Sequence, residues 1–409
     1  MSAVLSPAAP ALACWCGNAQ LQEYGGGYLL CPSCSTLVSV RRAAPDPGRV
    51  RDEAADLYGA NYFFEHARAL GHPDLAERAR SDLSERCEHW LRALLGLRPP
   101  PATTLELGCA SGAFVALLTG AGYAATGQEL SPAIAALARQ TFGVPVLAGP
   151  IEEQQLAHGS VDALILLDVL EHLHDPLRVL GAALPALRGD GLLLLQLPCF
   201  DPALSHAALL ESGHPFRTML LPDEHLYLYS RASVVQLLGR LGLAHQIFLT
   251  PIFSAHDMFL AAARQAIHPV AEDAWRSALR ASREGRIVEA LTDACAAARG
   301  RLELSQRLDQ VEGDRARRLE LILAQQKDLE RLHADLERLR ADGAAVRQDA
   351  VQARAELAAA AAAADTAQRE LAHTRAELEG AQRRAAQVPT WIRALFWRPD
   401  RALDQDPRP

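Results

Sequence analysis

The sequence predicts an α/β protein with a doubly wound, parallel central sheet. Between about residues 101 and 265, five short apolar runs alternate with amphipathic helical stretches; the runs read TLEL, AATGQ, VPVL, ALILL and GLLLLQL. Apolar runs of this length are typical of strands covered by helices on both faces. A glycine-punctuated turn, LELGCASGAF at residues 105–114, joins the first run to its helix, which is the strand–turn–helix unit of such sheets.

The segments between these runs carry helix signals. Helices are expected to begin near four positions: Gly112, Ser131, Glu152 and Asp175. The polar stretch at 198–230 is expected to be a loop or lid over the strand ends. SRASVVQLLGRLG then predicts a capped helix, and AHQIFLT and MFLAAA predict two antiparallel edge strands.

The composition indicates a soluble protein, and the distribution of its cysteines suits a cytoplasmic protein better than a disulfide framework. The chain has 409 residues and a formal charge of −8. Its length and its 49% hydrophobic residues suffice for two or three folded units. The negative charge would repel a phosphate backbone, so no nucleic-acid partner is expected. No apolar run approaches the ~20 residues that cross a bilayer, and the first residues lack the basic leader of a secretory signal.

Half of the eight cysteines lie near the start of the sequence, in the pairs Cys14-Trp-Cys16-Gly and Cys31-Pro-Ser-Cys34. Two closely spaced pairs fit two turns that hold zinc tetrahedrally. Such a site is structural, because four thiolates leave no open position for catalysis. The sequence therefore predicts a zinc-ribbon-like module over residues 1–40, with free thiols as the alternative.

Changes in composition divide the rest of the chain. A helical pattern ends at the prolines of RPPPA, and a seven-residue repeat begins near Arg301. The predicted segments are a linker and helical segment at 41–100, the α/β domain at 101–265, a helical connector at 266–300, a coiled coil at 301–388, and an aromatic-basic tail at 389–409.

The repeat predicts an apolar seam along the coiled coil. Its positions include Leu304, Leu308, Val311, Ile322, Leu329, Leu332, Leu336, Leu339, Val346, Leu357, Leu371 and Leu378. An apolar seam must be buried, so we expect a homo-oligomer through the coiled coil, with a helical spacer as the alternative. The tail, with its tryptophans and arginines, suits either peripheral contact with the inner face of the membrane or packing on a partner.

The glycine turn and one acidic residue indicate a nucleoside-containing ligand. The turn reads Gly108-x-Ala110-x-Gly112, which differs from the G-x-G-x-x-G spacing of dinucleotide sites. Glu129 follows Gly108 by 21 residues, at the end of the second run. A carboxylate at that place can accept hydrogen bonds from both hydroxyls of a ribose.

Residues 105 to about 243 resemble a class I S-adenosylmethionine-dependent methyltransferase. The resemblance rests on LELGCASGAF with Glu129, on LLDVLEHLHDPLRVL, which carries the D-V-L-E-H-L-x-D-P signature of one subgroup, and on DEHLYLYSRASVVQLLGRLGL. It implies a Rossmann-like sheet of seven strands and S-adenosylmethionine as the methyl donor. The architecture also resembles enzymes that act on sugars and polysaccharide precursors, in which small zinc modules precede the methyltransferase domain.

The resemblance also implies the residues that contact the cofactor. They are Glu106, Gly108, Cys109, Ala110 and Gly112 around the methionine moiety, Glu129 and Leu130 at the ribose, Ile151 and Glu152 at the adenine, and Asp168 where methyl donor and acceptor meet. Pro150 stands where the family usually has Asp, so the adenine contact is expected to rest on the Ile151 backbone and Glu152. Ala110 replaces a commoner glycine.

The chemistry requires positioning of the acceptor and, for a hydroxyl, removal of a proton. His225, His172 and Asp168 are the candidate catalytic residues; His225 and His172 are candidate bases, and Asp168 could orient the acceptor. We therefore expect methyl transfer to a small-molecule or glycan acceptor, with an oxygen of a sugar or polysaccharide precursor favoured over carbon or nitrogen. The alternatives are an NAD-dependent oxidoreductase and a non-catalytic scaffold.

Overall fold

The structure is a computed structural model that describes residues 12–43, 49–66, 68, 71, 73–339 and 346–386. The chain forms two compact units, Met1–Glu289 and Ala290–Pro409. Within the described residues, no helix is both long enough and apolar enough to cross a membrane.

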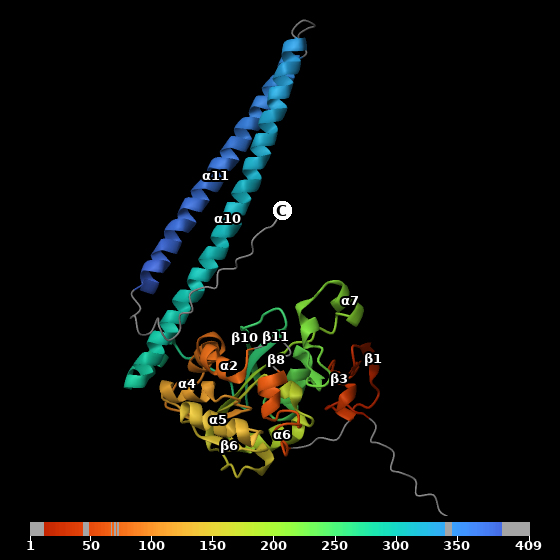
Figure 1. The fold of residues 1–409 in the computed structure, drawn as a ribbon, viewed down its shortest axis with the longest axis vertical. Helices are drawn as coiled ribbons and strands as arrows, with labels where there is room; N and C mark the ends of the chain where they lie inside the picture. The colour runs from red at the N-terminus through yellow and green to blue at the C-terminus, as the bar shows by residue number, and fades with distance from the viewer. Residues whose placement is uncertain are drawn as a thin grey trace, which may run out of the picture. The chain divides into compact units, whose positions relative to one another are not determined.

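A seven-stranded sheet forms the centre of the first unit (Figure 1). Its order is β10 (His245–Leu249), β11 (Asp257–Ala263), β8 (Leu187–Pro198), β7 (Val161–Leu167), β4 (Thr103–Leu107), β5 (Ala124–Glu129) and β6 (Val146–Ala148). All neighbouring pairs are parallel except the two that β11 makes, with β8 and with β10. The predicted α/β sheet is confirmed, but only β11 runs antiparallel, inserted beside the edge strand β10.

The centre of the sheet is apolar on both faces, as the unbroken apolar runs predict. Every residue of β7 is buried, and so are the last eight residues of β8. Strands of this kind need helices on both sides. The strand-order reversal falls between β4 and β7, so ligands are expected at the carboxyl ends of these strands.

The helices of the sheet begin where three of the four sequence signals predict. Gly112 precedes α4 (Ala113–Ala121), while the side chains of Ser131 and Asp175 cap α5 (Pro132–Phe142) and α6 (Pro176–Ala183). The fourth signal, at Glu152, was wrong about length. Only a single 3-10 turn forms there, η4 (Ile151–Glu153), because a segment this short cannot propagate a helix and Gln154 is already extended.

The segment before the sheet is less regular than its helical pattern indicates. It contains two π-helical turns, η2 (Tyr62–His66) and η3 (Leu83–Cys87), with α2 (Leu75–Asp82) before η3 and α3 (Glu88–Leu95) after it. From α2 to α3 the helix is continuous, whereas residues 49–59 form bends and turns. Trp90 anchors this segment to the sheet, because its indole N–H donates to the Gln196 side chain (2.9 Å).

The cysteine-rich module shares a second, small sheet with the predicted lid. Its strands are β1 (Gln22–Gly25), β2 (Tyr28–Leu30), β3 (Leu37–Ser39) and β9 (Tyr227–Leu228). The turn η1 (Val40–Ala43) follows β3 in the module. The lid also holds α7 (His206–Glu211) and η7 (Pro215–Met219), and α8 (Arg231–Arg240) follows it. Cys14, Cys31 and Val38 belong to the same apolar cluster as Leu195 in the large sheet, so module and sheet share one core.

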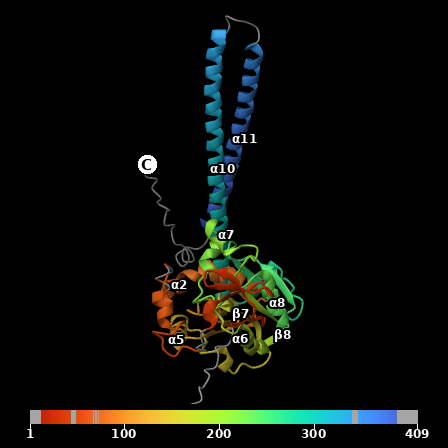
Figure 2. The ribbon, with the colours of Figure 1, turned by 90° about the vertical axis from the view of Figure 1, so that its right-hand side faces the viewer.

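The second unit is a helical hairpin. After α9 (Glu272–Arg280), the chain enters α10 (Arg283–Leu339) and returns in α11 (Val346–Ala386), and both views show the two long helices side by side (Figure 1 and Figure 2). Contacts pair Arg307 with Glu377 and Glu312 with Arg375, so the helices are antiparallel. The predicted seven-residue repeat thus packs, at least in part, within one chain.

The predicted seam residues are only partly buried in this hairpin. Leu371 is buried, and Leu304, Leu308, Val311, Ile322, Leu329, Leu357 and Leu378 are half-buried. Leu332 is exposed. The side chains of Leu336, Leu339 and Val346, and the whole aromatic-basic tail at 389–409, lie outside the described residues.

Candidate active site

A cavity of about 1050 Å³ lies at the carboxyl ends of β4, β5 and β7. The predicted catalytic residues Asp168, His172 and His225 all line it. The predicted cofactor residues that line it are Glu106, Gly108, Cys109, Ala110, Glu129, Leu130, Ile151, Glu152 and Asp168. Gly112 does not. It stands one residue before α4, where an added Cβ would lie 3.0 Å from the Cβ of Ala138, so it serves helix packing.

The turn after β4 is shaped by backbone conformations that favour glycine. Gly108 has φ +70°, and an added Cβ would lie 2.7 Å from a methyl of Val169. The amide groups of Gly108 and Cys109 both donate to the Gln128 carbonyl, at 2.8 and 3.0 Å, which ties the turn to the end of β5. Ala110 also has positive φ, at +44°, in a region that a side chain seldom occupies.

Two buried carboxyl groups line the cavity beside this turn. Glu106 is 5% exposed, and its Oε2 has no hydrogen-bond partner among the described residues. Burial, and then the nearby Glu129 carboxylate, raises the pKa of Glu106 to about 8. Glu129 accepts hydrogen bonds from the amides of Ala110 (3.0 Å) and Ser131 (3.1 Å). A carboxylate oxygen has two lone pairs, so Glu129 keeps acceptor capacity for a ligand.

Asp168 lies at the end of β7 with positive φ, at +56°. Its carboxylate accepts from the Gln196 amide at 3.2 Å and faces the guanidinium of Arg86 at 3.4 Å. A strained backbone fixed by two partners from different elements is a feature of functional sites. Asp168, which lines the cavity, is therefore held in one orientation.

Three titratable side chains meet beyond Asp168. One ligand atom from each of Glu171, His172 and His225 lies within 4.8 Å of the other two. The two imidazole rings are 4.9 Å apart between centroids. Burial, and then the neighbouring His225 ring, lowers the pKa of His172 to about 3, and burial lowers the pKa of His225 as well. Both imidazoles are therefore neutral at neutral pH.

One wall of the cavity comes from a segment that carries no recognisable motif. Tyr58, Tyr62, Arg86 and Trp90, all preceding the first strand of the large sheet, line it. The Tyr58 hydroxyl lies 2.9 Å from Nδ1 of His172. These residues were missed by sequence reasoning, because an amphipathic pattern shows that a segment packs but not what it packs against.

The adenine side of the predicted site is less polar. Ile151 is buried and lines the cavity together with Pro150. Glu152 also lines the cavity, and its carboxylate forms an ion pair with Arg178 at 2.8 Å. The contacts of Ile151 and Glu152 with adenine stay predictions.

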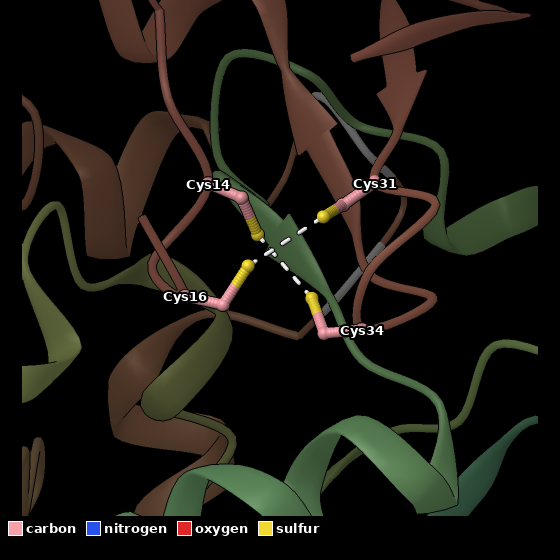
Figure 3. Close-up of side chains that lie close together, drawn as sticks. All are labelled: Cys14, Cys16, Cys31 and Cys34. Carbon is pink, nitrogen blue, oxygen red and sulfur yellow. Dashed lines mark hydrogen bonds between the residues drawn. The ribbon is translucent and has the colours of Figure 1, made fainter. Parts of the chain in front are cut away.

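The four cysteines of the N-terminal module converge on one point (Figure 3). The sulfur atoms of Cys14 and Cys34 are 3.5 Å apart, and those of Cys16 and Cys31 are 3.6 Å apart. Four thiolates around a tetrahedral zinc, with Zn–S bonds of about 2.3 Å, have sulfurs about 3.8 Å apart. All eight cysteines are free of disulfide bonds, so the arrangement fits a metal ion.

Local backbone geometry explains why the two cysteine pairs turn inward. Gly17, after the first pair, has φ +95°, and Ser35, after the second, has φ +58°. The amides of Gly17 and Ser35 donate back to the carbonyls of Cys14 and Cys31, each at 2.9 Å. Each pair is thus the corner of a tight turn, and the sulfurs of the two corners point toward one another (Figure 3).

Comparisons with known proteins agree with this fold. The family model described as "Methyltransferase domain" matches residues 79–246. No curated protein is significantly similar to this chain in sequence.

Several solved structures are similar to it. A chain in the complex of the Haloferax volcanii Trm112 methyltransferase activator with a methyltransferase has 18% identity and a TM-score of 0.37, covering 46% of this chain and 95% of that one. Magnesium protoporphyrin IX methyltransferase from Synechocystis has 18% identity and a TM-score of 0.36, covering 50% and 97%. Geranyl diphosphate C-methyltransferase from Streptomyces coelicolor has 15% identity and a TM-score of 0.34, covering 44% and 75%.

The chain therefore carries a methyltransferase domain. Its seven-stranded sheet has the form that the resemblance to class I, S-adenosylmethionine-dependent methyltransferases implies.

Proposed function

We propose that this enzyme methylates a hydroxyl oxygen of a sugar or of a polysaccharide precursor. The observation that carries the proposal is the set of polar side chains Asp168, His172 and His225, which line the same cavity as the glycine turn. A hydroxyl acceptor needs a proton acceptor and polar groups that orient it, whereas an apolar acceptor needs neither.

The residues around the glycine turn fit S-adenosylmethionine. The unpartnered Oε2 of Glu106 can accept from the cationic amino group of the methionine moiety. Gly108 leaves space in the turn that a side chain would fill. Glu129 has spare hydrogen-bond acceptor capacity for ribose hydroxyls. Cys109, Ala110, Leu130, Ile151 and Glu152 would complete the contacts, with Gly112 setting the helix behind them. When bound, the cofactor supplies a methyl group already activated on a sulfonium.

The chain's own residues would position the acceptor. Asp168 is fixed by Gln196 and Arg86 and would accept a hydrogen bond from the substrate. His225 or His172 would take the proton of the hydroxyl, the freed oxygen would bond to the methyl carbon, and the electron pair of the broken carbon–sulfur bond would stay on sulfur.

We propose a structural zinc ion in the cysteine cluster of residues 1–40. Four sulfurs that lie within 4.8 Å of one another, two pairs of them at 3.5 and 3.6 Å, support it. Elemental analysis of protein purified under reducing, chelator-free conditions should find about one zinc per chain. A zinc-free, folded protein would remove the assignment.

We propose that the chain is a cytoplasmic homo-oligomer, assembled through the 301–388 segment. Several leucines of α10 are exposed: Leu302, Leu319, Leu321, Leu323 and the predicted seam residue Leu332. Apolar side chains along a helix are normally buried by a partner. Light scattering during size exclusion should give a mass of two or more chains. A monomeric mass at all concentrations would contradict this proposal.

The proposed acceptor is tested by product analysis. The enzyme is incubated with a methyl-deuterated cofactor and a glycan-precursor extract, and the products are separated by mass spectrometry. We expect labelled products whose fragments place the methyl group on a sugar oxygen. Label on carbon or nitrogen, or on compounds that contain no sugar, would contradict the proposed acceptor.

A further inference from the structure

The cavity contains a second cluster with the composition of a metal site. Glu171, His172 and His225 come from the turn after β7 and from the lid, and one ligand atom from each lies within 4.8 Å of the others. In a metal site with bonds of about 2.1 Å, neighbouring ligand atoms are about 3 Å apart and opposite ones about 4 Å. The cluster therefore needs only small side-chain movements to close on an ion.

The hydrogen bonds of both histidines leave the same ring atom free. Nδ1 of His172 lies 2.9 Å from the Glu224 carbonyl, and Nδ1 of His225 lies 2.7 Å from the Met219 carbonyl. A carbonyl only accepts, so each Nδ1 carries the proton and each Nε2 keeps its lone pair. The Tyr58 hydroxyl, also 2.9 Å from Nδ1 of His172, then accepts from the same N–H. A histidine that binds a metal through one nitrogen usually donates to a carbonyl through the other.

Glu171, the third member of the cluster, is a buried carboxyl group. Its side chain is 1% exposed, and Oε2 has no hydrogen-bond partner among the described residues. Oε1 lies 3.9 Å from Nε2 of His172, too far for a hydrogen bond. A buried carboxyl oxygen without a partner is costly, and a bound cation removes that cost.

We propose that Glu171, His172 and His225 bind a divalent first-row metal ion on which the acceptor docks. This metal site adds detail to the proposed hydroxyl methylation, and the role given to the metal rests on that proposed function. Two imidazoles and one carboxylate favour Mn²⁺, Fe²⁺, Co²⁺ or Zn²⁺ over Mg²⁺ or Ca²⁺, which prefer oxygen ligands. Three protein ligands leave positions open for substrate. The favoured acceptor is therefore a compound with two adjacent oxygen donors, such as neighbouring sugar hydroxyls.

The site changes the role given to the two histidines. As ligands they cannot take the proton of the acceptor. A cation beside the hydroxyl lowers its pKa, so the proton leaves to water and the oxygen then bonds to the methyl carbon. Atoms and charge balance as before, because only the destination of the proton differs.

Binding of Mn²⁺ to the full chain tests the site. Mn²⁺ suits nitrogen and oxygen ligands and competes poorly for the thiolates of the cysteine cluster. Titration followed by the electron paramagnetic resonance signal of free Mn²⁺ should show about one bound ion per chain. Glu171→Gln, which keeps the shape of the neutral carboxyl, and His225→Ala should each weaken binding at least about tenfold.

A matched control is His174→Ala. His174 lines the same cavity but lies outside the cluster, and its Nε2 bonds to the Arg42 carbonyl at 2.9 Å. This variant should bind Mn²⁺ as the unmutated chain does. Circular dichroism and zinc content show whether each variant is folded.

Two results would overturn the metal site: no Mn²⁺ binding by the folded chain, or equal binding by Glu171→Gln and the unmutated protein. Failure of the site and failure of the proposed function are separable. Methylation of a sugar oxygen by a folded chain that binds no Mn²⁺ would reject the site and leave the function. Mn²⁺ binding without sugar methylation would support the site and reject the proposed function.

Discussion

The Tyr28 hydroxyl, in the cysteine-rich module, donates a 3.0 Å hydrogen bond to the backbone carbonyl of His225 in the cavity wall. Tyr28 is 1% exposed, so this bond is shielded from water. The neighbouring strand adds a second link, because the Ser39 hydroxyl donates to the Pro222 carbonyl at 2.6 Å. The module therefore fixes the position of a residue in the candidate active site.

Removing this single hydrogen bond should affect catalysis. Tyr28→Phe leaves the His225 carbonyl without this partner, which costs about 1–3 kcal/mol for a buried group. We expect normal zinc content, a lower melting temperature and a kcat reduced several-fold. The matched control is Tyr24→Phe: Tyr24 lies in the same small sheet and donates at 3.0 Å to the Leu204 carbonyl, also in the lid. Equal kcat losses in both variants would contradict a specific link to His225.

Disrupting the cysteine cluster should act through the same link. Cys31→Ser removes one of four ligands, so we expect loss of zinc, a destabilisation of about 2–3 kcal/mol and a melting temperature lower by about 5–10 °C. Methyl transfer should fall as well, because Tyr28 is three residues from Cys31. Cys295→Ser, a buried cysteine outside the cluster, is the control. Unchanged zinc content in Cys31→Ser would reject the cluster as the zinc site.

The glycine turn can be probed with two glycines of similar conformation. Gly108 has φ +70° and a Val169 methyl 2.7 Å from an added Cβ, whereas Gly143 has φ +66° and open space. Gly143→Ala should cost only about 1 kcal/mol for its backbone conformation. Gly108→Ala should cost more and weaken S-adenosylmethionine binding at least about tenfold. Gly108→Arg should abolish binding. Calorimetry that shows equal cofactor affinity for the two alanine variants would contradict a role of the Gly108 turn in binding the cofactor.

The buried Glu106 should give the cofactor-free protein a specific pH dependence. Burial, and then Glu129, raises its pKa from 4.5 to about 8. The contribution of Glu106 to stability is therefore fully present below pH 4.5 and is lost as the pH rises through about 8. Glu106→Gln stays neutral, so its melting temperature should rise relative to the unmutated protein between about pH 5 and about pH 9. Parallel melting curves over that range would show that Glu106 ionises normally.

The same group should release a proton on cofactor binding. A cationic amino group favours the ionised carboxylate, so binding near neutral pH should expel a proton from Glu106. Calorimetry in buffers of different ionisation enthalpy measures this directly. Proton release should disappear in Glu106→Gln.

The parts of the site that were predictable from sequence rest on local requirements. Gly108 marks a turn that a Cβ would block, and Ser131 and Asp175 mark helix starts because their side chains cap the helices that follow. The cysteine pairs were readable for the same reason, since each is a short turn of its own.

The rest depends on contacts between distant segments. The Tyr58–His172 contact and the pairing of Leu37 with Leu228 join residues more than a hundred positions apart, and no local pattern encodes such partners. The seven-residue repeat has the same limit. It shows that a seam is buried, but the pairing of Glu312 with Arg375 could not be foreseen, because one repeat suits a partner chain or a returning helix equally well.

The central claim is that the cavity beside Gly108 binds S-adenosylmethionine, and isothermal titration calorimetry of the unmutated full chain tests it most directly. We predict saturable binding of about one cofactor per folded chain, lost in Gly108→Arg. Absence of binding to the unmutated, folded protein would contradict the account.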